Sequence, residues 1–168
     1  FTTQKPFISL SNYPMYIQAA KSLPKSADYK FIYKDIYNPK NHNHILKNYF
    51  KKFEFIKLKS TPPGQAISVL EGIKKVQNEL INISACDHSI IFNYNLLKET
   101  IIRKSFDILV WVKKGYKEAT LQPNMYSWVD CQGQKIKRIS VKKPLKNPSS
   151  DPLVIGTFSF LNKDIYIK

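Results

Sequence analysis

Apolar residues recur along this chain with two different spacings, and the balance between them changes beyond the middle. In residues 14–23, 41–53, 65–80 and 96–104 the apolar positions return every three or four residues, which predicts four amphipathic helices. The run 65–80 is the most regular of these, because its apolar side chains share one face: Ile67, Leu70, Ile73, Val76 and Leu80.

Short runs of apolar, β-branched and aromatic residues lie between the predicted helices, and they predict strands at residues 30–34, 55–58, 81–86 and 107–112. The last run is continuously apolar, which is typical of a strand buried on both faces. Beyond Gly115 the pattern predicts strands at 126–130, 136–141 and 154–160, with a polar, proline-rich loop over 142–152. Alternating elements followed by a β-rich second half predict an α/β protein whose sheet has mixed strand direction.

Composition limits the class of protein. A length of 168 residues suits one domain, and 43% hydrophobic residues exclude a wholly disordered chain. No run approaches the roughly 18 apolar residues of a membrane-spanning helix. Cys86 and Cys131 lie far apart without zinc-type spacing, which favours a reduced, cytoplasmic setting.

A formal net charge of +15, from 27 basic and 12 acidic residues, raises the question of nucleic-acid binding. However, Arg103 and Arg138 are the only arginines. Lysine is a hydrated point charge that lacks the planar fork with which arginine reads guanine and phosphate. We therefore expect most lysines to be solvated, no nucleic-acid partner, and at most an attraction for small anionic substrates.

The first candidate for chemistry is Asp87, which follows the strand-like run 81–86. Ligands of open α/β sheets gather at the carboxyl ends of strands, where one carboxylate can hold a hydrated Mg²⁺ against substrate phosphates. The alternative is that Asp87 caps the following segment. His88 beside it fits either the same site or a structural role.

The turn before helix 65–80 is a second candidate, because backbone N–H groups at a helix start suit an anion or the polar edge of a base. It contains Thr61, Pro63, Gly64 and Gln65, although any strand-to-helix connection uses such residues. Two lysines that precede prolines, Lys5 and Lys143, either meet phosphates or are ordinary surface residues. His42 and His44, two positions apart, do not share a helix face, so we expect both to be exposed.

The order of these segments is more specific than any one of them. It runs T-x-K-P-F-I, Y-P-M, T-P-P-G-Q-A, I-S-A-C-D-H, D-I-L-V-W-V, P-N-M-Y-S-W-V-D, V-K-K-P and V-I-G-T-F-S-F. This succession resembles the sugar-phosphate nucleotidyltransferases, especially the bacterial branch found with capsule and surface-polysaccharide genes.

The resemblance implies a Rossmann-like α/β/α sandwich with a mixed, mainly parallel sheet. It also implies an Mg²⁺-dependent reaction between a nucleoside triphosphate, with CTP modestly preferred, and a phosphorylated small-molecule acceptor. By the same resemblance the catalytic residues are Lys5, Asp87 and Lys143, with Asp87 on the metal. The nucleotide side comprises Thr61, Pro63, Gly64, Gln65 and Ser84, and the acceptor side comprises His88, Asn124, Tyr126 and Gly156.

Two departures from the family pattern matter. The family opens with a strand and a glycine-rich loop, and it often carries a late acidic residue; residues 1–168 match neither. We therefore expect one nucleotidyltransferase-like domain that lacks its first loop and a C-terminal portion. Alternatives are a glycosyltransferase of the same fold, disfavoured by Asp87-His88-Ser89 in place of Asp-x-Asp, or a non-catalytic binding module. A homo-oligomer is compatible with the sequence.

Overall fold

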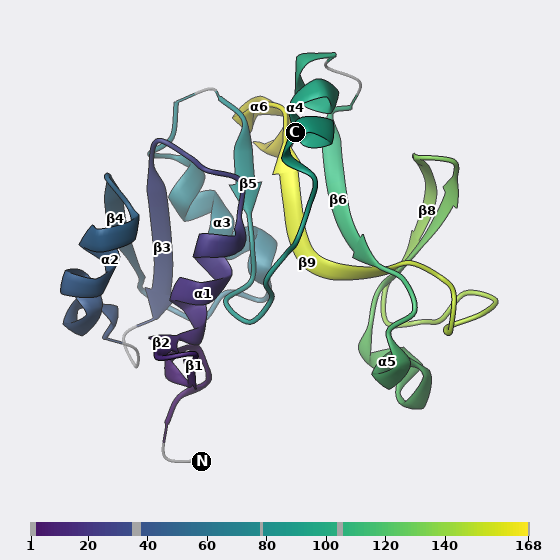
Figure 1. Ribbon diagram of the computed structural model, residues 1–168, viewed down its shortest axis with the longest axis horizontal. Helices are drawn as coiled ribbons and strands as arrows, with labels where there is room; N and C mark the ends of the chain where they lie inside the picture. The colour runs from purple at the N-terminus through teal and green to yellow at the C-terminus, as the bar shows by residue number, and fades with distance from the viewer. Residues whose placement is uncertain (1–2, 35–37, 78, 104–105, 168) are drawn as a thin grey trace. The chain divides into compact units, whose positions relative to one another are not determined.

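The computed structural model describes residues 3–34, 38–77, 79–103 and 106–167. Contacts divide the chain into two compact units (Figure 1). Unit 1 comprises Phe1–Ile108 and Phe160–Lys168, and unit 2 comprises Leu109–Ser159.

Unit 1 alternates helices with short strands along the chain. Its helices are α1 (Met15–Ser22), α2 (Asn43–Tyr49), α3 (Gln65–Ile73), α4 (Tyr94–Ile102) and α6 (Lys163–Ile167), with the 3-10 turns η1 (Lys5–Phe7) and η2 (Pro39–His42). Its strands are β1 (Ser9–Leu10), β2 (Tyr13–Pro14), β3 (Tyr29–Lys34), β4 (Phe53–Leu58) and β5 (Ile81–Ile83).

The parallel pair β3–β4 is the best-defined part of unit 1. The two strands run in register from Tyr29 opposite Phe53 to Lys34 opposite Leu58. Helix α3 packs closely on this pair, because a Cβ atom added to Gly72 would come within 2.9 Å of Ile32 Cδ1. The absence of a side chain at position 72 therefore sets how near the helix lies to the strands.

A buried cluster joins α1 and α2 to the parallel pair. Its members, which leave little or no surface to solvent, are Tyr16, Ile17, Ala20, Leu46 and Phe50. Partly buried aromatic rings from β3 and β4 pack against them. The apolar faces of the two helices thus bury against the strands, which is the main driving force for this arrangement.

Unit 2 is built mainly from antiparallel strands. Strand β7 (Trp128–Gln132) pairs with β8 (Lys135–Ser140) around a turn in which Gly133 has φ +61°. Strand β7 also pairs with β9 (Leu153–Phe160) at Trp128 opposite Leu153, and β9 pairs with β6 (Ile108–Lys113). A short helix α5 (Lys117–Leu121) and a 3-10 turn η3 (Pro123–Met125) complete it.

Trp128 is the centre of the small unit 2 core. It is fully buried with Ala119 and Leu153, and its Nε1 donates to the carbonyl of Pro123 over 3.0 Å. The rings of Tyr126 and Trp128 lie 6.4 Å apart. One large side chain thus connects α5, η3, β7 and β9.

The mixed α/β prediction is confirmed, since parallel and antiparallel strands occur together. Two predicted helices end early: 41–53 stops at Tyr49, and 65–80 stops at Ile73. The prediction that 107–112 is buried on both faces is wrong, because Ile108 and Val112 are exposed. Among the described helices, none has both the length and the apolar character required to cross a membrane.

Candidate functional site

Two of the predicted catalytic residues, Lys5 and Asp87, are in direct contact. Lys5 Nζ lies 2.5 Å from Asp87 Oδ2, and the Lys5 side chain is 65% exposed whereas that of Asp87 is 21% exposed. His88 Nδ1 lies 2.9 Å from the other carboxylate oxygen, Oδ1. Residues more than 80 positions apart therefore form one charged cluster, with the carboxylate at its centre.

Local structure brings the two partners together. Lys5 opens the 3-10 turn η1, where Pro6 fixes the backbone and the N–H of Phe7 donates to the carbonyl of Gln4 over 2.9 Å. Asp87 follows the carboxyl end of β5 by four residues. The segment after it is held by the N–H of Ile90, which donates to Ser22 Oγ over 3.0 Å. The cluster thus lies beyond the carboxyl end of a strand.

The contact shifts the pKa values of both partners. Burial by itself would raise the pKa of Asp87, but the hydrogen bond from Lys5 and the nearby His88 outweigh it, and the pKa is lowered. The hydrogen bond to Asp87 raises the pKa of Lys5. Asp87 is therefore anionic and Lys5 cationic at neutral pH.

An aromatic cluster that the sequence did not single out supports η1. The ring of Phe7 packs edge-on against Tyr16 at 5.9 Å and against His42 at 5.4 Å between ring centres. The Tyr16 hydroxyl and His42 Nδ1 are 3.2 Å apart. The prediction that His42 is exposed is wrong, because it packs here and is only partly accessible, whereas His44 is exposed.

The predicted nucleotide-side turn leads into α3, as expected. Gly64 is the N-cap of α3, and its carbonyl accepts from Ser68 N and Ser68 Oγ. Thr61 is exposed and its hydroxyl accepts a hydrogen bond from Lys34 Nζ. Pro63 is exposed, so this turn is open to solvent.

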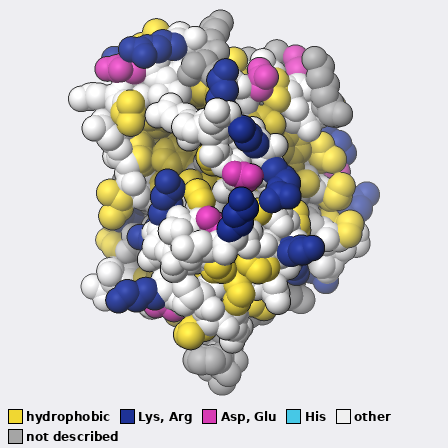
Figure 2. Space-filling view, turned by 90° about the vertical axis from the view of Figure 1, so that its right-hand side faces the viewer, with side chains coloured by type: hydrophobic (Ala, Val, Ile, Leu, Met, Phe, Trp, Pro, Cys, Tyr) yellow, Lys and Arg dark blue, Asp and Glu magenta, His cyan; other side chains and the backbone are white. Residues whose placement is uncertain are grey.

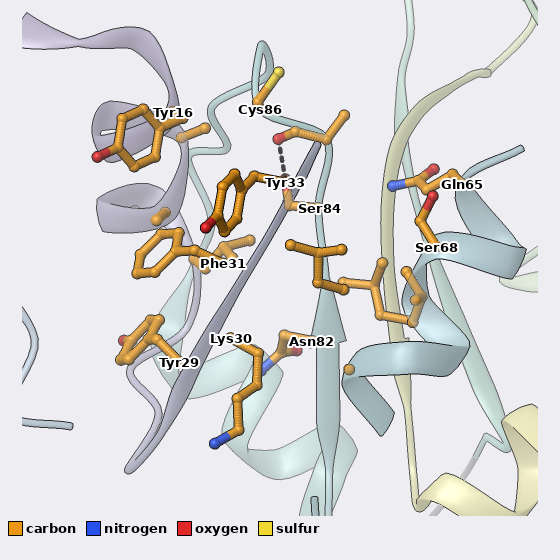
Figure 3. A pocket seen from close by; sticks show the side chains of 18 of the residues that line it. Tyr16, Tyr29, Lys30, Phe31, Tyr33, Gln65, Ser68, Asn82, Ser84 and Cys86 are labelled. Atoms are coloured by element: carbon orange, nitrogen blue, oxygen red, sulfur yellow. Dashed lines mark hydrogen bonds between the residues drawn. The ribbon is translucent and has the colours of Figure 1, made fainter. Parts of the chain in front are cut away.

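A cavity of about 650 Å³ lies inside unit 1, beside this turn. Gln65 and Ser68 line it from α3, and Ser84 lines it just beyond β5, as Figure 3 shows. The Ser84 hydroxyl donates to the carbonyl of Ala85 over 3.0 Å. Two predicted nucleotide-side residues, Gln65 and Ser84, thus border the same cavity.

The charged cluster around Asp87 offers a Mg²⁺ ion one carboxylate ligand. Among the described residues, no group of three or more His, Cys, Asp or Glu side chains is arranged to hold a metal. Mg²⁺, however, is commonly held by one or two carboxylates, with waters and substrate phosphates completing its coordination. Asp87, ionised and partly exposed, matches that arrangement as a single carboxylate ligand.

The remaining predicted residues lie in unit 2. Lys143 is exposed in the loop after β8, and its carbonyl accepts from Ser140 Oγ over 2.7 Å. Asn124 is exposed in η3, and Tyr126 is partly buried. Gly156 has φ +77° within β9, a backbone conformation that favours glycine.

Comparisons with known proteins give matches in structure but not in sequence. No family model matches the chain, and no curated protein matches it significantly. A nucleoside-diphosphate-sugar pyrophosphorylase from Vibrio cholerae RC9 superposes with a TM-score of 0.74 at 17% identity, over 99% of this chain and 68% of that one. The inositol-1-phosphate CTP transferase from T. maritima gives 0.74 at 18% identity, over 98% and 64%.

A third solved structure, a CMP:2-keto-3-deoxy-manno-octonic acid synthetase complexed with CTP, gives a TM-score of 0.63 at 12% identity, over 97% of this chain and 69% of that one. The chain thus spans about two thirds of the length of these proteins. At such low identity the likeness shows the fold: this chain has the fold of nucleotidyltransferase structures.

Proposed function

We propose that this chain belongs to a nucleotidyltransferase that moves a nucleoside monophosphate from a nucleoside triphosphate to a phosphorylated small-molecule acceptor. The observation that carries the proposal is the Lys5–Asp87 contact beyond the end of β5, in a chain with the fold of nucleotidyltransferase structures. A lysine and an ionised carboxylate side by side suit a triphosphate, since the lysine meets its oxygens and the carboxylate suits its cation.

The reaction requires no protein nucleophile. An oxygen of the acceptor phosphate attacks the α-phosphorus, and the bond to the oxygen that bridges the α- and β-phosphates breaks, so that pyrophosphate leaves with the electron pair. Charge neutralisation and alignment supply most of the catalysis of such a transfer. Mg²⁺ bound at Asp87 would add positive charge to the triphosphate.

Side chains and backbone groups of the protein would bind and orient the two substrates. Lys5 is mostly exposed, so its ammonium group can reach a phosphate while Asp87 keeps it near the strand end. The turn of Thr61, Pro63 and Gly64 and the cavity side chains Gln65 and Ser84 form the nucleotide side of the proposal. On the acceptor side the proposal keeps His88 together with the unit 2 residues Lys143, Asn124, Tyr126 and Gly156.

We favour CTP as the nucleotide, because one structural neighbour is named a CTP transferase and another was solved with CTP. A nucleotide-linked product would serve as a precursor for surface polysaccharide, made in the cytoplasm where nucleoside triphosphates are available. A homo-oligomer is part of the same proposal.

The test is pyrophosphate release by the full-length gene product with Mg²⁺, each nucleoside triphosphate in turn and a panel of phosphorylated acceptors. We expect release with a cytidine preference, and a loss of about 100-fold or more in Asp87→Asn, which keeps the shape and removes the charge. Asp107→Asn, at an exposed carboxylate outside the cluster, is the matched control and should retain activity. Turnover of a nucleotide sugar without any pyrophosphate release would refute the proposal.

A further inference from the structure

Strand β8 and the loop that follows it carry a concentrated positive charge in unit 2. Residues 135–146 contain six basic side chains and no acidic one: Lys135, Lys137, Arg138, Lys142, Lys143 and Lys146. The aliphatic residues between them are Ile136, Ile139, Val141 and Leu145. Basic clusters of this size on an amphipathic element are typical of surfaces that bind anionic lipid head groups.

The pairing of β7 with β8 separates the side chains of β8 between the two faces of the hairpin. Ile139 lies opposite Val129, and beyond a bulge Ile136 lies opposite Cys131. Because paired residues share a face and successive residues of β7 alternate, both isoleucines lie on the same face. The basic side chains on the opposite face are Lys135 and Arg138. Strand β8 is therefore amphipathic, with one aliphatic face and one basic face.

The aliphatic face of β8 is open to solvent. Ile136 is 39% exposed, Ile139 is 46% exposed, and Val141, which directly follows the strand, is 71% exposed. Val129 lies on the same face but is buried, so the packing that covers β7 does not extend to β8. Basic and hydrophobic side chains occur together on the face of the molecule on which β8 lies (Figure 2).

Charge and backbone geometry distinguish between the possible occupants of this face. None of the six basic side chains has an ion-pair partner in the described part of the chain, and a second copy would bring the same positive charges to the contact. Addition of a strand at the free edge of β8 is disfavoured by the bulge and the lysines. An acidic protein is bound best through arginine, yet five of the six residues are lysines, whose compact charge suits a diffuse anionic surface.

We propose that the aliphatic face of β8 binds to the surface of a membrane that contains anionic lipids. Ile136, Ile139 and Val141 enter the boundary between the head groups and the acyl chains. The lysines beside them reach the lipid phosphates, because the flexible aliphatic part of a lysine side chain can lie along an apolar surface while its ammonium group stays in water. This binding is peripheral and reversible, and it does not depend on nucleotidyl transfer.

The first test is flotation of the full-length gene product with unilamellar vesicles. We expect binding to vesicles of phosphatidylglycerol and phosphatidylcholine in equal amounts to be at least about tenfold tighter than binding to phosphatidylcholine alone, because the basic cluster attracts the anionic head groups. Added NaCl should weaken the binding, since salt screens these charges. Equal binding to the two kinds of vesicle, or no binding to either, would overturn the proposal.

Two pairs of lysines separate a specific surface from the effect of net charge. Lys135→Gln with Lys137→Gln should weaken binding to the phosphatidylglycerol vesicles about tenfold. Lys47→Gln with Lys51→Gln removes the same charge from exposed positions of unit 1 and should weaken binding less than about twofold. Equal losses in the two variants would show that overall charge alone attracts the protein to the vesicles, which would overturn the proposal.

A fluorophore on Cys131 tests whether the aliphatic face itself enters the membrane. Cys131 is exposed and lies opposite Ile136. In a Cys86→Ser background, a polarity-sensitive nitrobenzoxadiazole group on Cys131 should shift its emission to the blue on phosphatidylglycerol vesicles. The matched control carries the same group at position 121, because Leu121 is 82% exposed on α5, which packs on the Trp128 face of β7. Equal shifts at the two positions, or a shift at Cys131 that protein concentration alone produces, would overturn the proposal. If the labelled protein does not fold, flotation of the unsubstituted protein and of the lysine variants still decides.

Discussion

The charged side chains of the two units differ in how they are placed. In unit 1, Lys30 contacts Asp28 and Glu54, each at 3.1 Å, and Glu54 also pairs with Lys75. Unit 2 has nine basic residues and three acidic ones, hence a net charge of +6, and shows no ion pair among its described residues. Figure 2 shows lysine and arginine side chains spread over the face on which β8 lies.

The difference separates two roles of lysine in one chain. Lys30 donates hydrogen bonds to two carboxylates, that of Asp28 just before β3 and that of Glu54 on β4. Such a lysine stabilises the contact between the two strands and is not available to a ligand. A hydrated lysine without an acidic neighbour is available to an anionic ligand. Lys5 combines both properties, because it has a carboxylate partner and yet is largely exposed.

The largest effect should come from the core that keeps unit 2 together. Trp128→Ala removes a fully buried ring and its hydrogen bond to the Pro123 carbonyl, and we expect a loss of about 3–5 kcal/mol in the free energy of unfolding. Urea denaturation followed by circular dichroism measures it. Leu121→Ala, at an exposed site, should cost less than about 0.5 kcal/mol; similar losses in the two variants would show that unit 2 has no effective core.

The next largest effect should come from Lys30, the lysine that contacts two carboxylates. Lys30→Met should lower the free energy of unfolding by about 1–3 kcal/mol, because the Lys30 side chain is only 14% exposed and the carboxylates of Asp28 and Glu54 each lose one of their two lysine partners. One oxygen of Asp28, Oδ1, is already buried without a hydrogen-bond partner in the described part of the chain. Lys135→Met, on the exposed strand β8, should change stability by less than about 0.5 kcal/mol. Equal losses of stability in the two variants would contradict the view that lysines of unit 1 stabilise the fold and those of unit 2 do not.

An unpaired lysine of unit 2 should matter for activity rather than stability. Lys143→Ala should raise the KM for the phosphorylated acceptor about tenfold, close to 1.4 kcal/mol, and change the KM for the nucleoside triphosphate less. Steady-state pyrophosphate release with each substrate varied in turn measures both constants. An unchanged acceptor KM would remove Lys143 from the acceptor side.

The smallest effect should be a change in the pH dependence of stability when His42, which packs against Phe7 of η1, is replaced. Burial, with a smaller contribution from His44, lowers the pKa of His42. A histidine with a lowered pKa contributes stability that is present above its unfolded value of about 6.5 and lost as the pH falls below it. Between about pH 7.5 and 5, the free energy of unfolding should therefore fall less in His42→Gln than in the unsubstituted protein. We expect the two decreases to differ by under about 1 kcal/mol, and urea denaturation at each pH measures them. The same slope in both proteins would contradict this account.

Much of the local structure was predictable because its signal is local. The alternation around β7 and β8 and the helical spacing of α1 and α4 give elements within a few residues of those predicted. Helix α3 shows the limit. Its apolar face continues to Leu80, but after Ile73 the N–H of Lys75 and Val76 bond three residues back, to Gly72 and Ile73, and the helix ends.

The candidate site was predictable only in part, for a different reason. The resemblance to nucleotidyltransferases, which rests on the order of the motifs, placed Lys5 and Asp87 among the catalytic residues. Their contact was not predicted, because it joins segments that lie far apart in the sequence. The packing of Phe7 on Tyr16 and His42 was missed, because rings from η1, α1 and η2 meet there and no periodicity links them. The β1–β2 hairpin was missed because strands of two residues have no pattern.

The close packing of α3 on β3 also restricts how the sequence can change during evolution. Even alanine at position 72 would place its Cβ atom 2.9 Å from Ile32 Cδ1, so the Ile32 side chain would have to move. Because two side chains in contact do not change stability independently, we expect positions 32 and 72 to change together in related proteins, with a larger residue at 72 accompanied by a smaller one at 32.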